Sequence, residues 1–375
     1  MASEIKRVKK LLSYADVEIN GDRPWDIQVH DKRLFSRVFA SGSLGLGEAY
    51  MDGWWDSPAL DKFFDRVLTA KLEKRVIRFG VVWNVVKAKI RNRQRRKKAH
   101  EIGKAHYDKG NDLYKAMLDK RMNYSCGYWK KAKILDKAQE AKLELICKKI
   151  GLKKGMSVLD IGCGWGGFAK YAAEKYGVKV LGITVSKEQF KLANELCKNL
   201  PVEIRLQDYR SLKGTFDRIV SVGMIEHVGY KNYKSFMKVA SRCLKNDGLF
   251  LLHTIGNKKS RIMGDRWMDK YIFPRGMLPS IKQLSKAAEG LFVIEDLHNF
   301  GADYDRTLME WHANFNENWD ELKHNYDKGD DGERFKRMWN YYLLSCAGSF
   351  RSRRNQLWQI VLSKDGVRGG YKSIR

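Results

Sequence analysis

The segment from Val158 to Gly167, which reads Val-Leu-Asp-Ile-Gly-Cys-Gly-Trp-Gly-Gly, constrains the fold of this chain more than any other feature. An apolar strand pattern runs there directly into glycines and then into a helical pattern. Glycine is needed where a Cβ would block a close approach of the backbone to a ligand, or where φ must be positive. The sequence therefore predicts a strand-to-helix turn that binds a nucleotide-like ligand.

The residues around this turn narrow the class of ligand. The Asp-x-Gly-x-Gly-x-Gly spacing differs from the dinucleotide fingerprint, and no Gly-Lys-Ser/Thr follows, so a phosphate is not the expected ligand. Asp160, one step before the turn, suits a ligand with a cationic end. The spacing resembles the S-adenosylmethionine site of class I methyltransferases. A tight turn without a ligand is the alternative that this motif alone leaves open.

Length and charge limit the further possibilities. With 375 residues the chain is expected to form two domains, or one domain with large additions. The 72 Lys and Arg against 44 Asp and Glu give a formal charge of +28, which indicates an anionic partner. Composition alone does not separate nucleic acid from acidic lipid headgroups.

The cysteines and the apolar segments indicate the compartment. The six cysteines include no Cys-x-x-Cys pair and no His at zinc-finger spacing, so we expect free thiols and no metal. Residues 1–13 lack the apolar core of a secretion signal. No window supplies the roughly 20 apolar residues of a membrane span. The sequence predicts a cytoplasmic protein, peripherally associated with the inner face of the membrane.

The N-terminal part shows a change in composition that suggests a domain boundary. A basic helix is expected at 4–14, an irregular region at 17–57 and a helix at 60–90, whose second half, 76–86, is strongly apolar. Residues 87–98 are dense in positive charge. We therefore expect a lipid- or membrane-associating domain at 1–90, a basic linker at 91–104 and a catalytic domain at 105–375.

From Met156 onward, strand and helix patterns alternate at α/β spacing, which predicts a mainly parallel, Rossmann-like sheet with helices on both faces. The expected strands are Ser157–Ile161, Lys179–Ile183, Val202–Leu206, Arg218–Val222, Leu249–Thr254 and a later one, Leu357–Ser363. The expected helices are Gly167–Tyr176, Lys187–Leu200 and Tyr233–Leu244. The predicted fold class is α/β, of the class I methyltransferase type, with a smaller, mostly helical N-terminal domain.

Polar residues follow several of these strands, and ligands of open sheets bind at the carboxyl ends of the strands. Gly162 and Gly164 would hold the amino-acid part of the cofactor, and Thr184 with Gln189 would meet its ribose. After the third strand come Asp208 and Tyr209, which would suit adenine. A helix cap and a packed ring are the alternatives for these two residues.

Ionisable residues follow the fourth and fifth strands of the same sheet. Glu226 and His253 would lie beside the cofactor pocket. A partly buried carboxylate near an imidazole can act as a base or hold another base in place.

Several long motifs, in the same order along nearly the whole chain, resemble cyclopropane-fatty-acyl-phospholipid synthases, which belong to the class I methyltransferase superfamily. Those motifs are His106–Tyr114, Met122–Trp129, Val158–Gly167, Met224–Gly229, Leu252–Gly256, Phe300–Leu308 and Arg337–Gly348. The resemblance implies methylene transfer from S-adenosylmethionine to a cis double bond in an acyl chain of a membrane phospholipid.

The resemblance also implies site residues. In that family a bicarbonate ion removes the proton, and the positions that would hold it here are Cys126, Glu226, His253, Ile255 (through its backbone) and Tyr304. The cofactor contacts of the family map onto Tyr124, Ser125, Gly162, Gly164, Thr184, Gln189, Asp208 and Tyr209. Cys126 has no neighbouring group that would activate a thiol, so we do not expect a covalent role for it.

The expected partners follow from the substrate and from the charge. They are an unsaturated phospholipid in a bilayer and an anionic membrane surface, reached through the apolar and basic residues 76–98, together with a second copy of the chain in a homodimer. A core helix followed by a solvated linker is the alternative for 76–98.

Three other functions are compatible with parts of this sequence pattern. A nucleic-acid methyltransferase would share the charge and the cofactor, but neither an Asn/Asp-Pro-Pro-Tyr/Phe loop nor a Pro-Cys nucleophile follows the fourth strand. We therefore expect no nucleic-acid partner. A fatty-acyl methyltransferase would share most of this sequence. A lipid-binding protein with a relic pocket is disfavoured by the complete set of polar residues.

Overall fold

The computed structural model describes residues 2–72, 110–326 and 331–375. These residues form two compact units, and each unit is described by itself. The first takes in 2–72, 263–274, 304–326 and 331–355, and the second takes in 110–262, 275–303 and 356–375.

Each unit is made of several separate segments of the chain. One catalytic domain was expected from 105 to 375, whereas residues 263–274, 304–326 and 331–355 group with the N-terminal residues. The apolar segment 76–86, the basic run 87–98 and the expected linker 91–104 lie outside the described residues.

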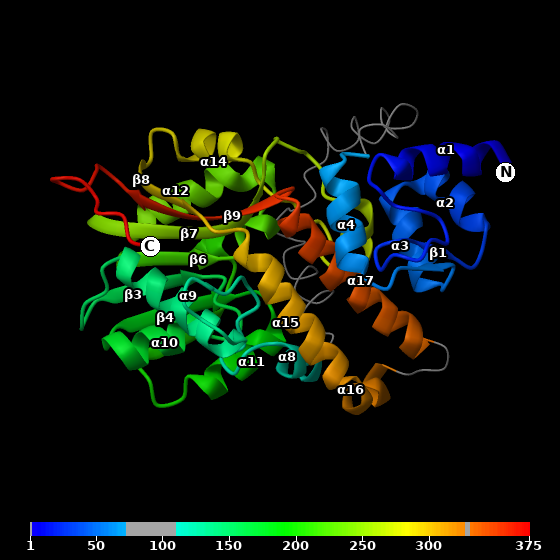
Figure 1. Ribbon diagram of the computed structural model, residues 1–375. Coiled ribbons are helices and arrows are strands. Elements are labelled where there is room, and N and C mark those ends of the chain that lie inside the picture. The colour runs from blue at the N-terminus through cyan, green and yellow to red at the C-terminus, as the bar shows by residue number, and fades with distance from the viewer. Residues whose placement is uncertain (1, 73–109, 327–330) are drawn as a thin grey trace. The chain divides into compact units, whose positions relative to one another are not determined.

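The second unit is built on a seven-stranded sheet with the order β5-β4-β3-β6-β7-β9-β8 (Figure 1). The five strands from β5 to β7 are parallel to their neighbours, and β8 pairs with β9 in antiparallel register. The strands are β3 Ser157–Ile161, β4 Lys179–Thr184, β5 Val202–Leu206, β6 Phe216–Val222, β7 Leu244–Asn257, β8 Val293–Asn299 and β9 Asn355–Ser363. The expected mainly parallel sheet is confirmed.

Side chains along the strands alternate between two apolar clusters, one on each face of the sheet. In β7, Phe250 and Leu252 belong to one cluster and Leu251 to the other, and in β9 Ile360 and Val361 divide in the same way. Strands buried on both faces read as continuous apolar runs, which is why their positions could be predicted.

Helices cover both faces of this sheet (Figure 1). Residues of α12 and α14 belong to one cluster, and residues of α9 and α10 belong to the other. The helices of this unit are α8 Asn111–Met117, α9 Leu135–Lys149, α10 Gly167–Tyr176, α11 Lys187–Leu196, α12 Tyr233–Cys243 and α14 Ile281–Ala288, with short 3₁₀ turns at η2 Tyr209–Ser211, η3 Ile225–His227 and η4 Tyr230–Asn232.

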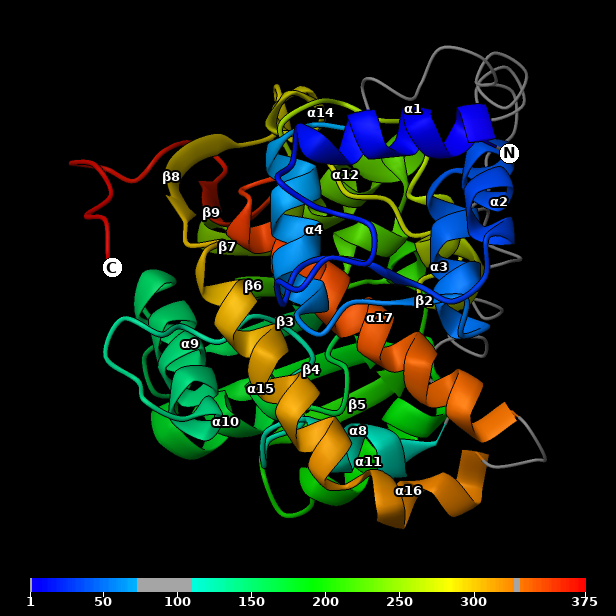
Figure 2. The same ribbon diagram turned by 45° about the vertical axis from the view of Figure 1, so that its right-hand side comes forward.

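The first unit is mostly helical, as expected, and α17 packs against α3 and α4 (Figure 2). Its elements are α1 Ala2–Ser13, β1 Gln28–Val29, α2 Arg33–Ser41, α3 Ser43–Met51, β2 Trp55–Asp56, α4 Leu60–Thr69, α13 Arg266–Tyr271, α15 Asp303–Glu317, α16 Trp319–Tyr326 and α17 Asp331–Arg351. The first residue of α15, Asp303, belongs to the second unit. Among the helices of the described residues, none has the length and apolar character needed to cross a bilayer.

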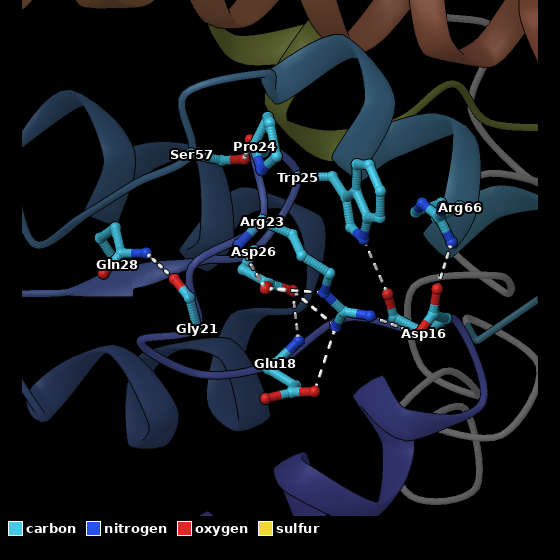
Figure 3. A network of polar contacts seen from close by, with 10 residues as sticks. All are labelled: Asp16, Glu18, Gly21, Arg23, Pro24, Trp25, Asp26, Gln28, Ser57 and Arg66. Carbon is cyan, nitrogen blue, oxygen red and sulfur yellow. Dashed lines mark hydrogen bonds and ion pairs between the residues drawn. The ribbon is translucent and has the colours of Figure 1, made fainter.

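A buried carboxylate organises the loop between α1 and β1 (Figure 3). Asp26 is 0% exposed and accepts hydrogen bonds from the backbone N–H of Glu18 at 2.7 Å and from Nε of Arg23 at 2.9 Å. Burial raises the pKa of Asp26, but these hydrogen bonds outweigh burial and leave the pKa below its ordinary value. Asp16 joins the network by pairing with Arg23 and with Arg66.

The structure corrects several expected element boundaries. Residues 17–57 were expected to be irregular, but α2 and α3 form there, and the helix expected over 60–90 ends at Thr69. The helices expected at 187–200 and 233–244 end at Leu196 and Cys243. The last expected strand, Leu357–Ser363, is present as β9, which begins at Asn355 and lies between β7 and β8.

Candidate active site

The glycine turn lies between β3 and α10, as predicted. Gly162 and Gly164 have φ of +86° and +57°, values that side chains other than hydrogen rarely allow. A Cβ on Gly162 would lie 2.6 Å from the side chain of Met224. The N–H of Gly162 donates to the carbonyl of Ile183 at 3.0 Å, which ties the turn to the carboxyl end of β4.

Two predicted cofactor residues contact each other beside this turn. The hydroxyl of Thr184 donates to Oε1 of Gln189 at 2.8 Å, and both side chains are buried. The backbone N–H of Gln207 donates to the carbonyl of Thr184, so the residues after β5 lie next to the same edge. These neighbouring strand ends form the edge at which ligands of parallel sheets bind.

Asp208 and Tyr209 are already engaged within the protein. The Asp208 carboxylate caps the η2 turn by accepting from the N–H of Arg210 at 2.9 Å, and it forms an ion pair with the Arg210 guanidinium. The ring of Tyr209 packs edge-on against Phe236, at 5.4 Å between centroids, and Tyr209 is 4% exposed. The cap and the packed ring considered from the sequence are therefore both present.

Tyr124 and Ser125 lie on a segment that packs against the start of α10. A Cβ on Gly167 would lie 2.5 Å from the carbonyl oxygen of Arg121 and 3.0 Å from Oδ1 of Asn123. This absence of a side chain lets the segment approach the glycine turn closely. The half-buried ring of Tyr124 contacts Tyr114 at 5.3 Å between centroids.

The structure places Glu226 against the backbone of Ile255, two residues after His253. Glu226 lies in η3 after β6, and its Oε1 accepts from the backbone N–H of Ile255 at 2.8 Å. His253 lies within β7, which continues to Asn257, and its side chain points to the same face as that of Ile255 because strand side chains alternate. The N–H of Gly223 donates to the carbonyl of His253 at 2.9 Å.

Two buried polar atoms in this cluster have no hydrogen-bond partner among the residues that the structure describes. They are Oε2 of Glu226 and Nε2 of His253, and the two residues are 7% and 1% exposed. An unpaired buried polar atom costs about 1–3 kcal/mol, so native proteins keep such atoms mainly where a ligand or water binds. This pair is the strongest sign of a ligand site in the second unit.

Burial disfavours the charged form of both groups. Burial raises the pKa of Glu226 to about 7, although the N–H of Ile255 opposes the rise. Burial lowers the pKa of His253 well below its ordinary value, and the positive charges of Lys142 and Lys149 lower it further. The imidazole is therefore neutral at physiological pH.

Cys126 is fully buried in the same unit, and its Sγ lies 3.1 Å from the carbonyl oxygen of Gly127. Aromatic contacts connect this region to the histidine: the ring of Tyr128 contacts Phe300 at 5.3 Å, and Phe300 contacts His253 at 5.9 Å. Tyr304 belongs to the first unit, where its ring stacks on Phe350 at 4.5 Å.

A buried lysine on α9, which no sequence motif indicated, contacts the segment of Ser125. Lys142 is 1% exposed, and its Nζ donates to Oγ of Ser125 at 2.9 Å and to Oδ1 of Asn123 at 3.3 Å. Burial lowers the pKa of Lys142 to about 8, and Asp119 opposes that effect. Gln139, one turn earlier, donates to the carbonyl of Ser125 at 2.7 Å. Two polar residues on the apolar face of a helix were the signal that could have revealed this support.

Known proteins resemble this chain over most of its length. The sequence profile of mycolic acid cyclopropane synthetases matches residues 94–360. A cyclopropane-fatty-acyl-phospholipid synthase of Escherichia coli K12 is 54% identical over 98% of this chain and 94% of its own length. A probable fatty acid methyltransferase of Pseudomonas putida is 36% identical over 69% of this chain and 68% of its own length.

A solved structure confirms the fold. The crystal structure of a mycolic acid cyclopropane synthase complexed with SAH and CTAB matches with a TM-score of 0.65 and 32% identity, over 71% of this chain and 98% of that one. The expected class I methyltransferase fold is confirmed by this match and by the mainly parallel sheet. The chain thus belongs to the mycolic acid cyclopropane synthetase family and is an enzyme of the type represented by the cyclopropane-fatty-acyl-phospholipid synthases.

Proposed function

We propose that this protein transfers a methylene group from S-adenosylmethionine to a cis double bond in an unsaturated acyl chain of a membrane phospholipid, which forms a cyclopropane ring. The observation that carries the proposal is the 54% identity, over 98% of the chain, to a cyclopropane-fatty-acyl-phospholipid synthase. The buried cluster of Glu226 and His253 supports it, because it offers the unpaired polar atoms that a proton-accepting site needs.

We assign the cofactor to the carboxyl edge of β3, β4 and β5. Gly162 and Gly164 would let the backbone approach the amino-acid part, while Thr184 and Gln189 would meet the ribose. Tyr124, Ser125, Asp208 and Tyr209 complete the assigned set. S-adenosylmethionine supplies the sulfonium methyl carbon that the alkene attacks.

We assign a bicarbonate ion to Cys126, Glu226, His253, the backbone of Ile255 and Tyr304. The unpaired Oε2 of Glu226 and Nε2 of His253 suit a small oxyanion with its own proton, because a neutral imidazole can donate one hydrogen bond. A carboxyl group with a pKa near 7 can also donate or accept at that oxygen. When bound, bicarbonate would supply the base that accepts the proton. The assignment of Tyr304 rests on the family resemblance.

In the proposed reaction the protein does not activate the alkene by removing a proton from it. An alkene has no proton that a base could remove to activate it, so the site must align its π face with the sulfonium methyl group and exclude water. Cys126 and His253 are 0% and 1% exposed, so little water reaches them. Exclusion of water protects the carbocation until a proton leaves the transferred carbon and the ring closes.

The acyl chain lies in a bilayer, so we propose that the protein works in the cytoplasm, bound peripherally to the inner face of the membrane. The charge of +28 supports attraction to anionic lipid, at about 1 kcal/mol for each lysine or arginine near the surface. Binding to vesicles should rise with anionic lipid content and fall with added salt. Equal binding to neutral and anionic vesicles would contradict the proposed electrostatic attraction.

We also propose a homodimer, which light scattering would report as twice the mass of the chain.

The proposed function can be tested with purified protein, S-adenosylmethionine labelled on its methyl group, and vesicles of an unsaturated phospholipid. Label should enter the acyl chains, and their mass should rise by that of one CH₂ group. Methyl addition with retention of the alkene gives the same mass, so the remaining unsaturation must be measured as well. Labelling of RNA or DNA, with the lipid unchanged, would refute the proposal.

A further inference from the structure

A buried glutamine on the strand next to β7 contacts the proposed anion-binding histidine. Gln359 lies in β9, the neighbour of β7, and is 0% exposed. Its Nε2 lies 3.3 Å from Nδ1 of His253. Gln359 lies between Trp358 and Ile360, which face one apolar cluster, so its own side chain faces the other side, as does that of His253.

The orientation of the amide group follows from a count of unpaired atoms. With Nε2 toward the imidazole, the only buried amide atom of Gln359 left without a partner among the described residues is Oε1. If the amide were reversed, Oε1 would be paired, and the two N–H donors of Nε2 would be left in that position instead. The first orientation leaves Oε1 and one N–H unpaired, whereas the reversed orientation leaves both N–H donors unpaired, and a buried carbonyl oxygen without a partner is tolerated better than a buried N–H without one. The amide therefore donates, and Nδ1 of His253 accepts.

An imidazole nitrogen that accepts a hydrogen bond carries no proton. Since the ring of His253 is neutral, its single N–H must then be at Nε2. Nε2 is the atom that has no partner among the described residues, on a ring that Phe300 also contacts. The donor of the imidazole is thus directed to the position where the ligand is expected.

We propose that Gln359 is a positioning residue that holds His253 in the tautomer protonated at Nε2, so that this N–H donates a hydrogen bond to the anion. The identity of the anion rests on the proposed function, whereas the choice of tautomer rests on the contact between Gln359 and His253. In this arrangement His253 orients the base and does not itself remove the proton.

Nitrogen NMR of protein labelled with ¹⁵N-histidine tests the proposal on the unmodified enzyme. His253 should show an unprotonated Nδ1 and a protonated Nε2, and its signals can be assigned from a His253→Phe sample among the eight histidines. A protonated Nδ1 with a bare Nε2, or a charged ring, would overturn the proposal. This measurement does not depend on whether any variant of Gln359 folds.

Variants then test whether Gln359 is the cause. In Gln359→Glu the carboxylate accepts at Nδ1, so the proton should move to Nδ1 or the ring should become charged. The bicarbonate concentration for half-maximal activity should also rise by roughly tenfold to a hundredfold, because a hydrogen bond to an anion is lost or changed. An unchanged tautomer in a folded Gln359→Glu protein would overturn the proposal.

Gln356→Glu is the matched control. Gln356 lies in the same strand, and its Oε1 accepts from Asn299 at 3.1 Å and from Trp358 at 3.2 Å, which a carboxylate can also do. It should leave the tautomer of His253 unchanged, and a change would overturn the specific role of Gln359.

Titration of bicarbonate into the wild-type sample tests the identity of the anion separately from the role of Gln359. Signals of His253 that do not move would refute the anion assignment, while the tautomer would still decide the role of Gln359.

Discussion

Replacement of Glu226 by glutamine should make the protein more stable at pH 8 while it removes activity. Burial raises the pKa of Glu226 from 4.5 to about 7, so the folded protein holds its proton more tightly than the unfolded chain does. A group of this kind contributes stability that is fully present below pH 4.5 and is lost as the pH rises through 7. At pH 8 the wild-type protein therefore keeps a buried charge that disfavours folding.

The magnitude follows from the same pKa difference. A tenfold change in a proton-binding constant is worth about 1.4 kcal/mol, so the change from 4.5 to about 7 amounts to about 3 kcal/mol at pH 8. Glutamine keeps an oxygen that can accept from the N–H of Ile255 but cannot ionise. The free energy of unfolding of Glu226→Gln should exceed that of the wild type by about 3 kcal/mol at pH 8, and by less than about 1 kcal/mol at pH 5.

Urea unfolding followed by circular dichroism, at pH 5 and at pH 8 in buffer free of bicarbonate, measures this difference. Exposed Glu289 provides the control, because Glu289→Gln should change stability little at either pH. A Glu226→Gln protein that is no more stable than the wild type at pH 8, or equally more stable at both values, would refute the reasoning about the buried carboxyl group.

Three further substitutions test the supports of the site. Lys142→Met removes the ammonium that donates to Ser125 at 2.9 Å, and should weaken S-adenosylmethionine binding roughly tenfold in calorimetry. Gly162→Ala, at φ +86°, should lower stability by about 1–2 kcal/mol or more and impair cofactor binding, as thermal unfolding and calorimetry would show. Asp296→Asn leaves the buried ammonium of Lys149, 3.7 Å away, without its carboxylate, and should cost about 3–5 kcal/mol in urea unfolding.

Each of these substitutions has a control on the same chain. Lys148→Met changes an exposed lysine of the same helix, Gly155→Ala tests a positive φ without a close neighbour, and Asp365→Asn changes an exposed carboxylate. Unaltered cofactor affinity in Lys142→Met would contradict the role given to the α9 lysine. Equal losses of stability and of cofactor binding in Gly162→Ala and Gly155→Ala would contradict a specific requirement for glycine at position 162. A loss in Asp296→Asn no larger than in Asp365→Asn would contradict the pairing.

The central strands and the glycine turn could be predicted because their signals are local. Strands buried on both faces give apolar runs, and the positive φ values of Gly162 and Gly164 require glycine. Glu226 and His253 were predicted because they follow such strands in the sequence. That β7 extends from Leu244 to Asn257, beyond the expected Leu249–Thr254, could not be predicted from the local sequence pattern.

The missed elements depend on contacts between distant residues. The glycines of α3 suggested an irregular region, but Gly45 and Gly47 leave room for the backbone of Arg37 and the ring of Trp267, where a Cβ would lie within 2.5 Å of an atom. β8 is an edge strand whose apolar residues are partly exposed, so its pattern is weak. The sequence of one segment alone does not reveal such contacts with distant residues, so these elements could not be predicted.

The supports of the site were missed for the same reason. Lys142 and Gln359 are 217 residues apart in the sequence, and neither belongs to a recognisable motif. Each interrupts an otherwise apolar pattern, in α9 and in β9. A polar residue in such a place indicates a buried partner, but only the fold shows that the partners are Ser125 and His253.

The fate of the hydrogens on the transferred carbon tests the central claim most directly. Purified protein is incubated with S-adenosylmethionine carrying a fully deuterated methyl group and with vesicles of an unsaturated phospholipid, and the released fatty acids are analysed by mass spectrometry. Ring closure predicts a product that keeps two of the three deuterium atoms and has lost its double bond. A product that keeps all three deuterium atoms, or lipid that carries no deuterium, would contradict the account.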